Sequence, residues 1–432
     1  MNNSKKKKPL ASPPCEFTSS KNFILQRIFS TTERESNRAL SRADGEAQPD
    51  CLLPSVTKAE GSTIVRQSYL QPSAFSLSSV SRMTPEEALE LFEVPIHDLG
   101  SRADEVRKSL HPSGTVTFII DRNINYTNVC INRCRFCAFW RSPEDPDAYV
   151  LSMNQILKKV EETVAVGGTQ ILLQGGLHPG LDLDFYIKIL RTIKSNFNIN
   201  LHGFSPPEIW YLARRHDLTI RETLSILKSA GLDSIPGGGA EILSDRVREV
   251  LSPKKIKSSQ WLMVMEEAHR LGMKTTATMM FGSVEKKEDI IEHLTVIRDL
   301  QDRTGGFTAF IPWTYQPGNT ELGGQKATAL EYLRVLAISR LYLDNIKNIQ
   351  ASWVTQGMKI AQLALRFGAN DFGSTMLEEN VVSSTGYRVG IGCEGNSSGR
   401  PEGMVATVVN AIKSAGFIPA QRDTYYNILK YW

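Results

Sequence analysis

The chain has 432 residues, of which 41% are hydrophobic and 22% are charged, a composition typical of soluble globular proteins. No uninterrupted apolar run approaches the roughly 20 residues that a membrane-spanning helix needs, so we expect no membrane partner. The first 82 residues hold 12 basic and 7 acidic side chains, whereas the remainder holds 38 against 39. The net charge of +4 therefore comes from the N-terminal stretch, and the nearly neutral remainder argues against a nucleic-acid partner.

Residues 1–82 show no sustained hydrophobic periodicity and carry a run of lysines at positions 5–8. They lack the apolar core of a secretory signal, and their acidic residues are unusual for an organelle transit peptide. We expect this stretch to be a disordered extension, or sequence outside the working protein, that is dispensable for activity. The folded domain is then expected to span residues 83–432.

Ordered structure is predicted to start at a helix that begins with Thr84 and Pro85. Threonine is a favoured N-cap, and proline is favoured at the first helical position. Glu86 and Glu87 follow in the first turn, where the helix dipole favours acidic side chains. A second short helix is expected over residues 99–109.

Short apolar runs alternate with helical patterns from residue 115 onward, which is typical of βα repeats and a parallel sheet. Eight runs are predicted to be strands: residues 115–120, 169–173, 200–204, 233–235, 275–280, 306–311, 348–353 and a weak eighth at 369–372. Eight such units predict an α/β fold of the (β/α)8 barrel type, which we expect to end in a C-terminal helical cap. A doubly wound open sheet fits less well, because no G-x-G-x-x-G turn follows the first run.

Cys130, Cys134 and Cys137 form a C-x3-C-x2-C pattern after the first predicted strand. Iron–sulfur clusters normally take four cysteine ligands, so three thiolates leave one iron open to a ligand from outside the protein. A zinc site is the alternative, but zinc prefers paired C-x2-C units with a fourth ligand, and no histidine is near in sequence. The other three cysteines are scattered singly, which indicates a reducing, cytoplasmic compartment and no disulfide framework.

Polar and small residues follow the predicted strands, and in such a barrel the chemistry lies at the carboxyl ends of the strands. Gln174, Gly175 and Gly176 follow the second run, and glycine lets a ligand approach the backbone closely. The turn at residues 237–241 follows the fourth run and ends in Glu241. This acid either binds a ligand or stabilises a helix N-terminus.

His202 lies in or at the end of the third predicted strand, and Ser205 and Glu208 follow at the same pole. Either His202 or Glu208 is a candidate general base whose pKa the cavity would tune toward the working pH. The alternative for a histidine in a strand is a structural role with satisfied hydrogen bonds.

Aromatic and basic residues lie near the same pole. Trp313, Tyr315 and Trp353 follow later strands and favour a pocket for a large aromatic substrate. Three arginines flank the cysteine pattern, and arginine suits carboxylate recognition; they are Arg122, Arg135 and Arg141.

The cysteine loop, with Phe136 between its last two cysteines, resembles that of the radical S-adenosylmethionine (SAM) superfamily. In that superfamily the open iron of a [4Fe–4S] cluster binds the amino and carboxylate groups of the methionine moiety. Further segments resemble the cyclic dehypoxanthine futalosine synthase family across residues 83–432; they are residues 121–130, 168–176, 202–208, 275–282, 306–314 and 349–357.

The resemblance implies a set of ligand contacts. The cluster would be ligated by Cys130, Cys134 and Cys137, and the matching glycine pair would present backbone carbonyls to the methionine ammonium. The residues expected at SAM are Phe136, Gln174, Gly175, Gly176, Ser205 and Glu241.

The resemblance also implies a reaction in menaquinone biosynthesis. An external one-electron donor reduces the cluster, and SAM splits into methionine and a 5′-deoxyadenosyl radical that removes hydrogen from ribose C4′ of a small nucleoside substrate. The resulting carbon radical closes a spiro ring on the benzoate. A sister radical SAM enzyme (aminofutalosine synthase or the deazaflavin-forming synthase) remains an alternative. A non-enzymatic iron–sulfur electron carrier is a more remote one, since it would want four protein ligands.

Overall fold

The computed structural model describes residues 82–387 and 401–432, so the expectations for residues 1–81 lie outside the described part of the chain. The first helix, α2 (Pro85–Glu90), begins as predicted. The Thr84 hydroxyl accepts a hydrogen bond from the Glu87 N–H, and the Glu87 carboxylate accepts one from the Thr84 N–H, which completes a capping box. The next helix, α3 (Ile96–Leu110), packs against α11 (Ala329–Tyr342).

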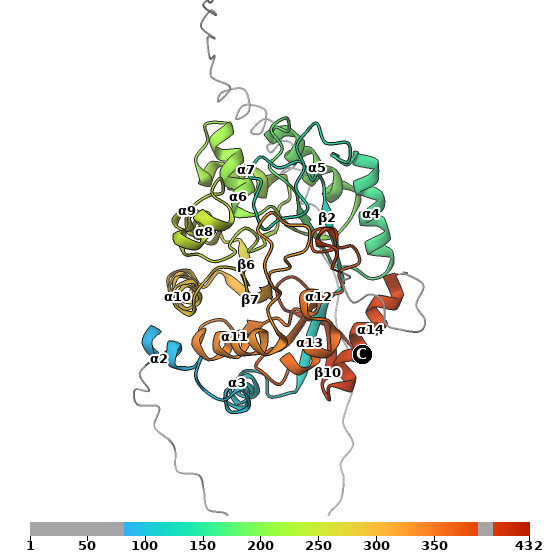
Figure 1. The fold of residues 1–432 in the computed structure, drawn as a ribbon. Coiled ribbons are helices and arrows are strands. Elements are labelled where there is room, and N and C mark those ends of the chain that lie inside the picture. The colour runs from blue at the N-terminus through green and yellow to red at the C-terminus, as the bar shows by residue number, and fades with distance from the viewer. Residues whose placement is uncertain (1–81, 388–400) are drawn as a thin grey trace, which may run out of the picture. The chain divides into compact units, whose positions relative to one another are not determined.

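A parallel sheet of seven strands forms most of the barrel wall. In spatial order it contains β2 (Asp121–Asn125), β3 (Gln170–Gln174), β4 (Asn200–Gly203), β5 (Ser234–Ile235), β6 (Lys274–Phe281), β7 (Phe307–Thr314) and β8 (Asn348–Ile349). Helices alternate with the strands and surround them, as Figure 1 shows. Before α11 they are α4 (Met153–Ala165), α5 (Leu183–Asn196), α6 (Pro206–Arg215), α7 (Ile220–Ala230), α8 (Asp245–Leu251), α9 (Ser258–Arg270) and α10 (Lys287–Thr304).

The barrel closes through the first strand. The strand β1 (Thr115–Ile119) runs almost directly into β2 and pairs in parallel with β9 (Asp371–Ser374). The strand β9 is joined to the end of β8 by a bridge between Gln350 and Asp371, where the Ala351 N–H donates to the Asp371 carbonyl at 2.8 Å. Counting β1 and β2 as one bent strand, eight strands close the ring, and the predicted (β/α)8 barrel is confirmed.

Two predicted strands differ in detail from the structure. The first, predicted over residues 115–120, corresponds to β1, which pairs with β9, and a further strand that the sequence did not predict, β2, follows it directly and pairs with β3. The seventh ends at Ile349, and Trp353 instead begins the short helix α12 (Trp353–Gln356), which α13 (Met358–Ala364) follows.

The C-terminal segment is not the purely helical cap that the sequence predicts. The helix α14 (Pro401–Ser414) is followed by β10 (Ile418–Arg422) and β11 (Ile428–Tyr431). A proline within β10, Pro419, argues against a strand in the sequence, yet β10 pairs in parallel with β1. This pairing brings the last residues of the chain to the lower end of the barrel. No described helix is long and apolar enough to cross a membrane.

Candidate active site

Two adjoining cavities lie at the carboxyl ends of the strands. The lumen cavity, inside the barrel, has a volume of about 290 Å³, and the cluster-loop cavity beside the cysteines has a volume of about 230 Å³. Six residues line both cavities, namely Gln174, Gly238, Gly239, Glu241, Trp313 and Val381. A ligand bound at the cysteine loop would therefore lie next to a ligand in the lumen.

The three cysteines all line the cluster-loop cavity. Cys134 is buried, Cys130 and Cys137 are half-buried, and no other cysteine lies in the described parts of the chain. Backbone hydrogen bonds hold the loop, since the Cys130 N–H donates to the Arg141 carbonyl at 3.1 Å and the Arg135 N–H donates to the Leu251 carbonyl at 2.9 Å. Three thiols that line one cavity match the number of cysteine ligands that a cluster with one open iron requires.

Glu241 lies between the two cavities and has the positive φ of 42° that non-glycine residues rarely adopt. Its Oε1 atom accepts a hydrogen bond from the Lys255 ammonium at 3.0 Å. Its buried Oε2 atom lies 3.6 Å from Arg248 Nη1 but has no hydrogen-bond partner among the described residues. Buried polar atoms are normally satisfied, so this oxygen is open to a donor from a ligand.

Lys255, in the loop between α8 and α9, completes the charge pattern beside the cysteines. Its ammonium donates a hydrogen bond to Glu241 and lies 5.1 Å from the centroid of the Phe136 ring. Burial acts to lower the pKa of Lys255, but the charges of Cys134 and Glu241 outweigh it and leave the pKa above its usual value. Lys255 therefore stays cationic, and no motif in the sequence marks a lysine in this loop as part of the site.

Gly175 and Gly176 pack against the chain that leads into the cysteine loop. A Cβ on Gly176 would lie 2.2 Å from the Val129 carbonyl oxygen, and one on Gly175 would lie 2.5 Å from the Tyr126 ring. The Gly176 N–H donates to the Thr127 carbonyl at 3.0 Å. Both glycines also line the cluster-loop cavity, so close packing within the protein and access to a ligand each require glycine here.

Ser205 and Glu208 form the capping box at the start of α6. The Glu208 carboxylate accepts hydrogen bonds from the Ser205 N–H at 2.7 Å, the Ser205 hydroxyl at 2.6 Å, the Tyr126 hydroxyl at 2.5 Å and the Gly175 N–H at 3.1 Å. Burial raises the pKa of Glu208, and these hydrogen bonds oppose the shift. Four donors within the protein favour a positioning role for this carboxylate over the predicted role as a general base.

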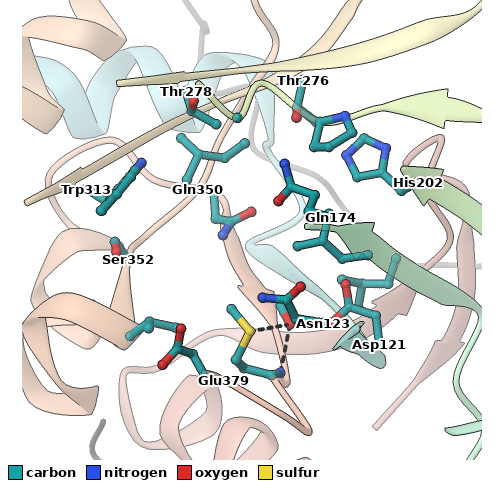
Figure 2. A pocket seen from close by; sticks show the side chains of 18 of the residues that line it. Asp121, Asn123, Gln174, His202, Thr276, Thr278, Trp313, Gln350, Ser352 and Glu379 are labelled. Carbon is teal, nitrogen blue, oxygen red and sulfur yellow. Dashed lines mark hydrogen bonds between the residues drawn. The ribbon is translucent and has the colours of Figure 1, made fainter. Parts of the chain in front are cut away.

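His202 lines the lumen cavity, and Figure 2 shows its ring near Gln174. Its Nδ1 atom lies 2.7 Å from the Ser234 hydroxyl. Burial, with a smaller contribution from the charge of Arg422, lowers the pKa of His202 to about 3. The imidazole is therefore neutral near pH 7 and is a weak base, which favours hydrogen bonding to a ligand over proton abstraction.

Of the three aromatic residues predicted to line a pocket, Trp313 lines both cavities. Tyr315 and Trp353 are buried instead. Tyr315 donates a hydrogen bond to the Gly323 carbonyl, and Trp353 donates one to the Ser374 carbonyl.

The three flanking arginines are engaged by carboxylates outside the cavities. The pairs are Arg122–Glu162 at 2.7 Å, Arg135–Glu321 at 2.8 Å and Arg141–Asp147 at 2.7 Å. Arg135 and Arg141 therefore help to hold the cysteine loop, Arg122 links β2 to α4, and none of the three lines either cavity.

Residues of β2 and of the C-terminal segment add polar groups to the walls of the lumen cavity. Alternate residues of β2 face inward, with Asp121 and Asn123 in the lumen cavity and Asn125 in the cluster-loop cavity. This alternation is the one signal in the sequence that would have identified Asp121 and Asn123 as lining residues. The C-terminal segment supplies three more lining residues, Arg422, Thr424 and Tyr426.

Comparisons with known proteins identify the superfamily of the chain. Residues 124–297 match the radical SAM superfamily, and residues 304–431 match the CofH/MqnC C-terminal region. The methylornithine synthase PylB has the same fold, with a TM-score of 0.62 and 18% identity over 79% of this chain and 95% of that structure. Fold and cysteine loop together define a radical SAM enzyme, whose cofactors are a [4Fe–4S] cluster and SAM.

The family follows from two sets of relatives. The chain is 45% identical over 367 residues to the cyclic dehypoxanthine futalosine synthase of Streptomyces coelicolor, covering 83% of this chain and 89% of that protein. It is 43% identical over 354 residues to the 5-amino-6-(D-ribitylamino)uracil–L-tyrosine 4-hydroxyphenyl transferase of Methanothermobacter thermautotrophicus, covering 80% and 94%. The chain belongs to the CofH/MqnC family of radical SAM enzymes, which contains the cyclic dehypoxanthine futalosine synthases.

Proposed function

We propose that this enzyme cyclises dehypoxanthine futalosine to cyclic dehypoxanthine futalosine in menaquinone biosynthesis, using an external one-electron donor. The observation that carries the proposal is the identity of 45–46% to two cyclic dehypoxanthine futalosine synthases, each over more than four-fifths of the chain. The lumen cavity supports it, because apolar side chains and neutral hydrogen-bonding groups both line this space next to the cysteine loop. A reducing compartment such as the cytoplasm suits an iron–sulfur enzyme with few cysteines.

Each part of the site then has a task. Cys130, Cys134 and Cys137 would hold the cluster, which together with SAM supplies a 5′-deoxyadenosyl radical. The open Oε2 atom of Glu241 would accept a hydrogen bond from SAM. The other residues expected around SAM are Phe136, Gln174, Gly175, Gly176 and Ser205, all of which line the cluster-loop cavity.

The lumen cavity would hold the ribose and the benzoate of the substrate. Buried walls exclude water from a carbon radical, and the adjoining cavities bring the ribose near the adenosyl carbon. The neutral His202 and the amides of Gln174 and Asn123 would orient the substrate by hydrogen bonds.

A second candidate is the 4-hydroxyphenyl transferase activity that other relatives carry by name. Their identities of 40–44% are only slightly below those of the cyclases. The transferase substrates, offered to the same protein, give a product of different mass, so one assay separates the two activities.

Replacing each cysteine of the loop by alanine should abolish formation of 5′-deoxyadenosine, because a cluster with two protein ligands would not be retained. Iron content, the visible absorption of the reconstituted protein and nucleoside products would be measured anaerobically. A Cys134→Ala protein with full activity would overturn the assignment of the cluster ligands.

Dehypoxanthine futalosine that carries deuterium at C4′ tests the reaction itself. The label should appear in 5′-deoxyadenosine, and the product should have two hydrogens fewer than the substrate, as mass spectrometry can show. A product that contains the adenosyl carbon would indicate a sister enzyme and contradict the proposed cyclisation.

We also propose that residues 1–82 are dispensable. The described structure begins with the capped helix α2, and Arg298 Nη1 donates to the Met83 carbonyl at 2.9 Å. A protein that starts at Met83 keeps both contacts and should retain its cluster and its turnover rate within about twofold. Loss of soluble, cluster-loaded protein on this truncation would contradict the prediction.

A further inference from the structure

We propose that Asp121 is the general base that removes the proton from the benzoate ring during cyclisation. This inference rests on the proposed function. When a bond forms between ribose C4′ and a ring carbon, the hydrogen on that ring carbon must leave before the ring is aromatic again. Its C–H bond breaks, the proton passes to the Asp121 carboxylate, and the one remaining electron leaves the ring to an iron–sulfur one-electron acceptor.

The position of Asp121 on β2 places its carboxylate with the substrate and away from the cysteines. Asn125 faces the cluster-loop cavity, whereas Asn123 and Asp121, two and four residues earlier on the same face of the strand, line the lumen cavity. Figure 2 shows Asp121 beside Asn123 on one wall, with Gln174 and His202 nearby. A ring held in the lumen would therefore lie within reach of Asp121.

The other carboxylates that line the lumen cavity are already engaged. Glu241 is paired with Lys255. Glu379 accepts hydrogen bonds from the N–H groups of Val382 and Ser383, both at 2.7 Å. Asp121 accepts two hydrogen bonds where Glu379 accepts three, and it has no ion pair with any residue in the described parts of the chain, unlike Glu241, so it is the lumen carboxylate best able to take a proton.

Two neutral groups hold the Asp121 carboxylate in place. Gln170 Nε2 donates to Oδ2 at 2.8 Å, and the Ser374 hydroxyl donates to Oδ1. Gln170 is itself fixed, because its carbonyl oxygen accepts a hydrogen bond from the Thr424 hydroxyl at 2.8 Å. Each carboxylate oxygen keeps a second acceptor position, so the group is oriented without being saturated.

The surroundings also suit a base of moderate strength. Burial raises the pKa of Asp121 to about 6, and the negative charge of Asp371 adds to this increase. The hydrogen bonds from Ser374 and Gln170 and the positive charge of Arg422 act in the opposite direction. Arg422 on β10 and Asp371 on β9 pair with each other at 2.5 Å. Asp121 is thus ionised near pH 7 and is a stronger base than an exposed aspartate.

The test compares two yields in one anaerobic assay with the full-length, cluster-loaded enzyme, SAM and dehypoxanthine futalosine. In Asp121→Asn the 5′-deoxyadenosine of the first turnover should form at a rate within about threefold of wild type, whereas cyclised product should fall by about 10²-fold or more. Substrate affinity, measured by quenching of tryptophan fluorescence, should change by less than about threefold because asparagine keeps the shape of the side chain.

The pH profile gives a second readout that a merely structural role would not change. The ratio of product to 5′-deoxyadenosine in wild type should fall as the pH drops through about 6, and this dependence should disappear in Asp121→Asn. His202→Gln is the comparison variant, since the imidazole lines the same cavity. A product ratio that is lost in His202→Gln and kept in Asp121→Asn would overturn the proposal.

The assay also separates the two hypotheses. Wild-type enzyme that forms no cyclised product contradicts the proposed function and the base together. Wild-type enzyme that forms product, with Asp121→Asn giving the same ratio of product to 5′-deoxyadenosine, contradicts the base alone. Product lost and 5′-deoxyadenosine kept in Asp121→Asn supports both.

Discussion

Replacing Glu208 by alanine is expected to destabilise the folded enzyme by about 3–5 kcal/mol, because four donors would lose their shared acceptor. The carboxylate is 2% exposed and accepts hydrogen bonds from Tyr126, from Gly175 and from both the N–H and the hydroxyl of Ser205. Each buried donor left without a partner costs roughly 1–3 kcal/mol, and water that enters the space recovers part of the sum. The shift of the urea midpoint for cluster-loaded protein measures the loss.

Tyr126→Phe is the matched control for Glu208→Ala, since it removes one of the four hydrogen bonds and keeps the ring. It should cost about 1 kcal/mol. Because the Gly175 N–H donates to Glu208 at 3.1 Å, Glu208→Ala should also weaken SAM binding, whereas Tyr126→Phe should leave the Gly175 contact in place. A loss of less than about 1 kcal/mol in Glu208→Ala would show that the carboxylate is not the centre of this network.

Asp121→Asn is expected to gain about 3 kcal/mol of stability relative to wild type as the pH rises from 4 to 8. The pKa of Asp121 is raised from 3.8 to about 6 in the folded state, so the folded protein binds more protons than the unfolded chain between these values. The stability of wild type therefore falls as the pH rises through this window, and the ionised carboxylate costs up to roughly 3 kcal/mol above it. Asparagine carries no charge and avoids this cost. Its NH2 group cannot accept the hydrogen bond from Gln170 Nε2 or from the Ser374 hydroxyl, but that loss is the same at every pH.

The comparison is made by urea unfolding of both proteins at several pH values. The stability of Asp121→Asn relative to wild type should be lowest near pH 4, should rise between pH 4 and 6, and should stay constant at higher pH. Asp371→Asn is the control, because it breaks a buried ion pair with Arg422 and should destabilise the enzyme by about 3–5 kcal/mol. A stability difference between Asp121→Asn and wild type that is the same at pH 4 and pH 8 would contradict the reasoning.

The barrel could be predicted from the sequence because most of its strands carry their own local signal. Apolar runs of a few residues alternate with helical patterns, and capping residues such as Thr84 mark helix starts. The cysteine loop was equally readable, since its three ligands lie within eight residues. Both features depend on neighbours in the sequence.

The rest of the site depends on neighbours in space. Lys255 binds Glu241 only because the loop after α8 lies against the cysteine loop, and no sequence pattern in the loop after α8 predicts this contact. Glu208 matches the position of a general base, but Tyr126 and Gly175, which directly follow β2 and β3, donate hydrogen bonds to its carboxylate, and only the structure shows these contacts. Residue type and strand position identified the pole of the barrel but did not assign roles within it.

The pairing of β1 with β10 has a consequence for how the enzyme is made. Thr115, near the start of the folded unit, has Ile418, near its end, as its register partner. The strand β1 therefore has no β10 to pair with until residues 418–422 have been translated. Contacts between residues so far apart in the sequence form slowly. Termination of translation eleven or more residues before Trp432 would leave the cysteine loop in the chain but remove Arg422, Thr424 and Tyr426, which line the lumen cavity. Such a shortened protein would keep the three cysteines but would lack part of the wall of the lumen cavity.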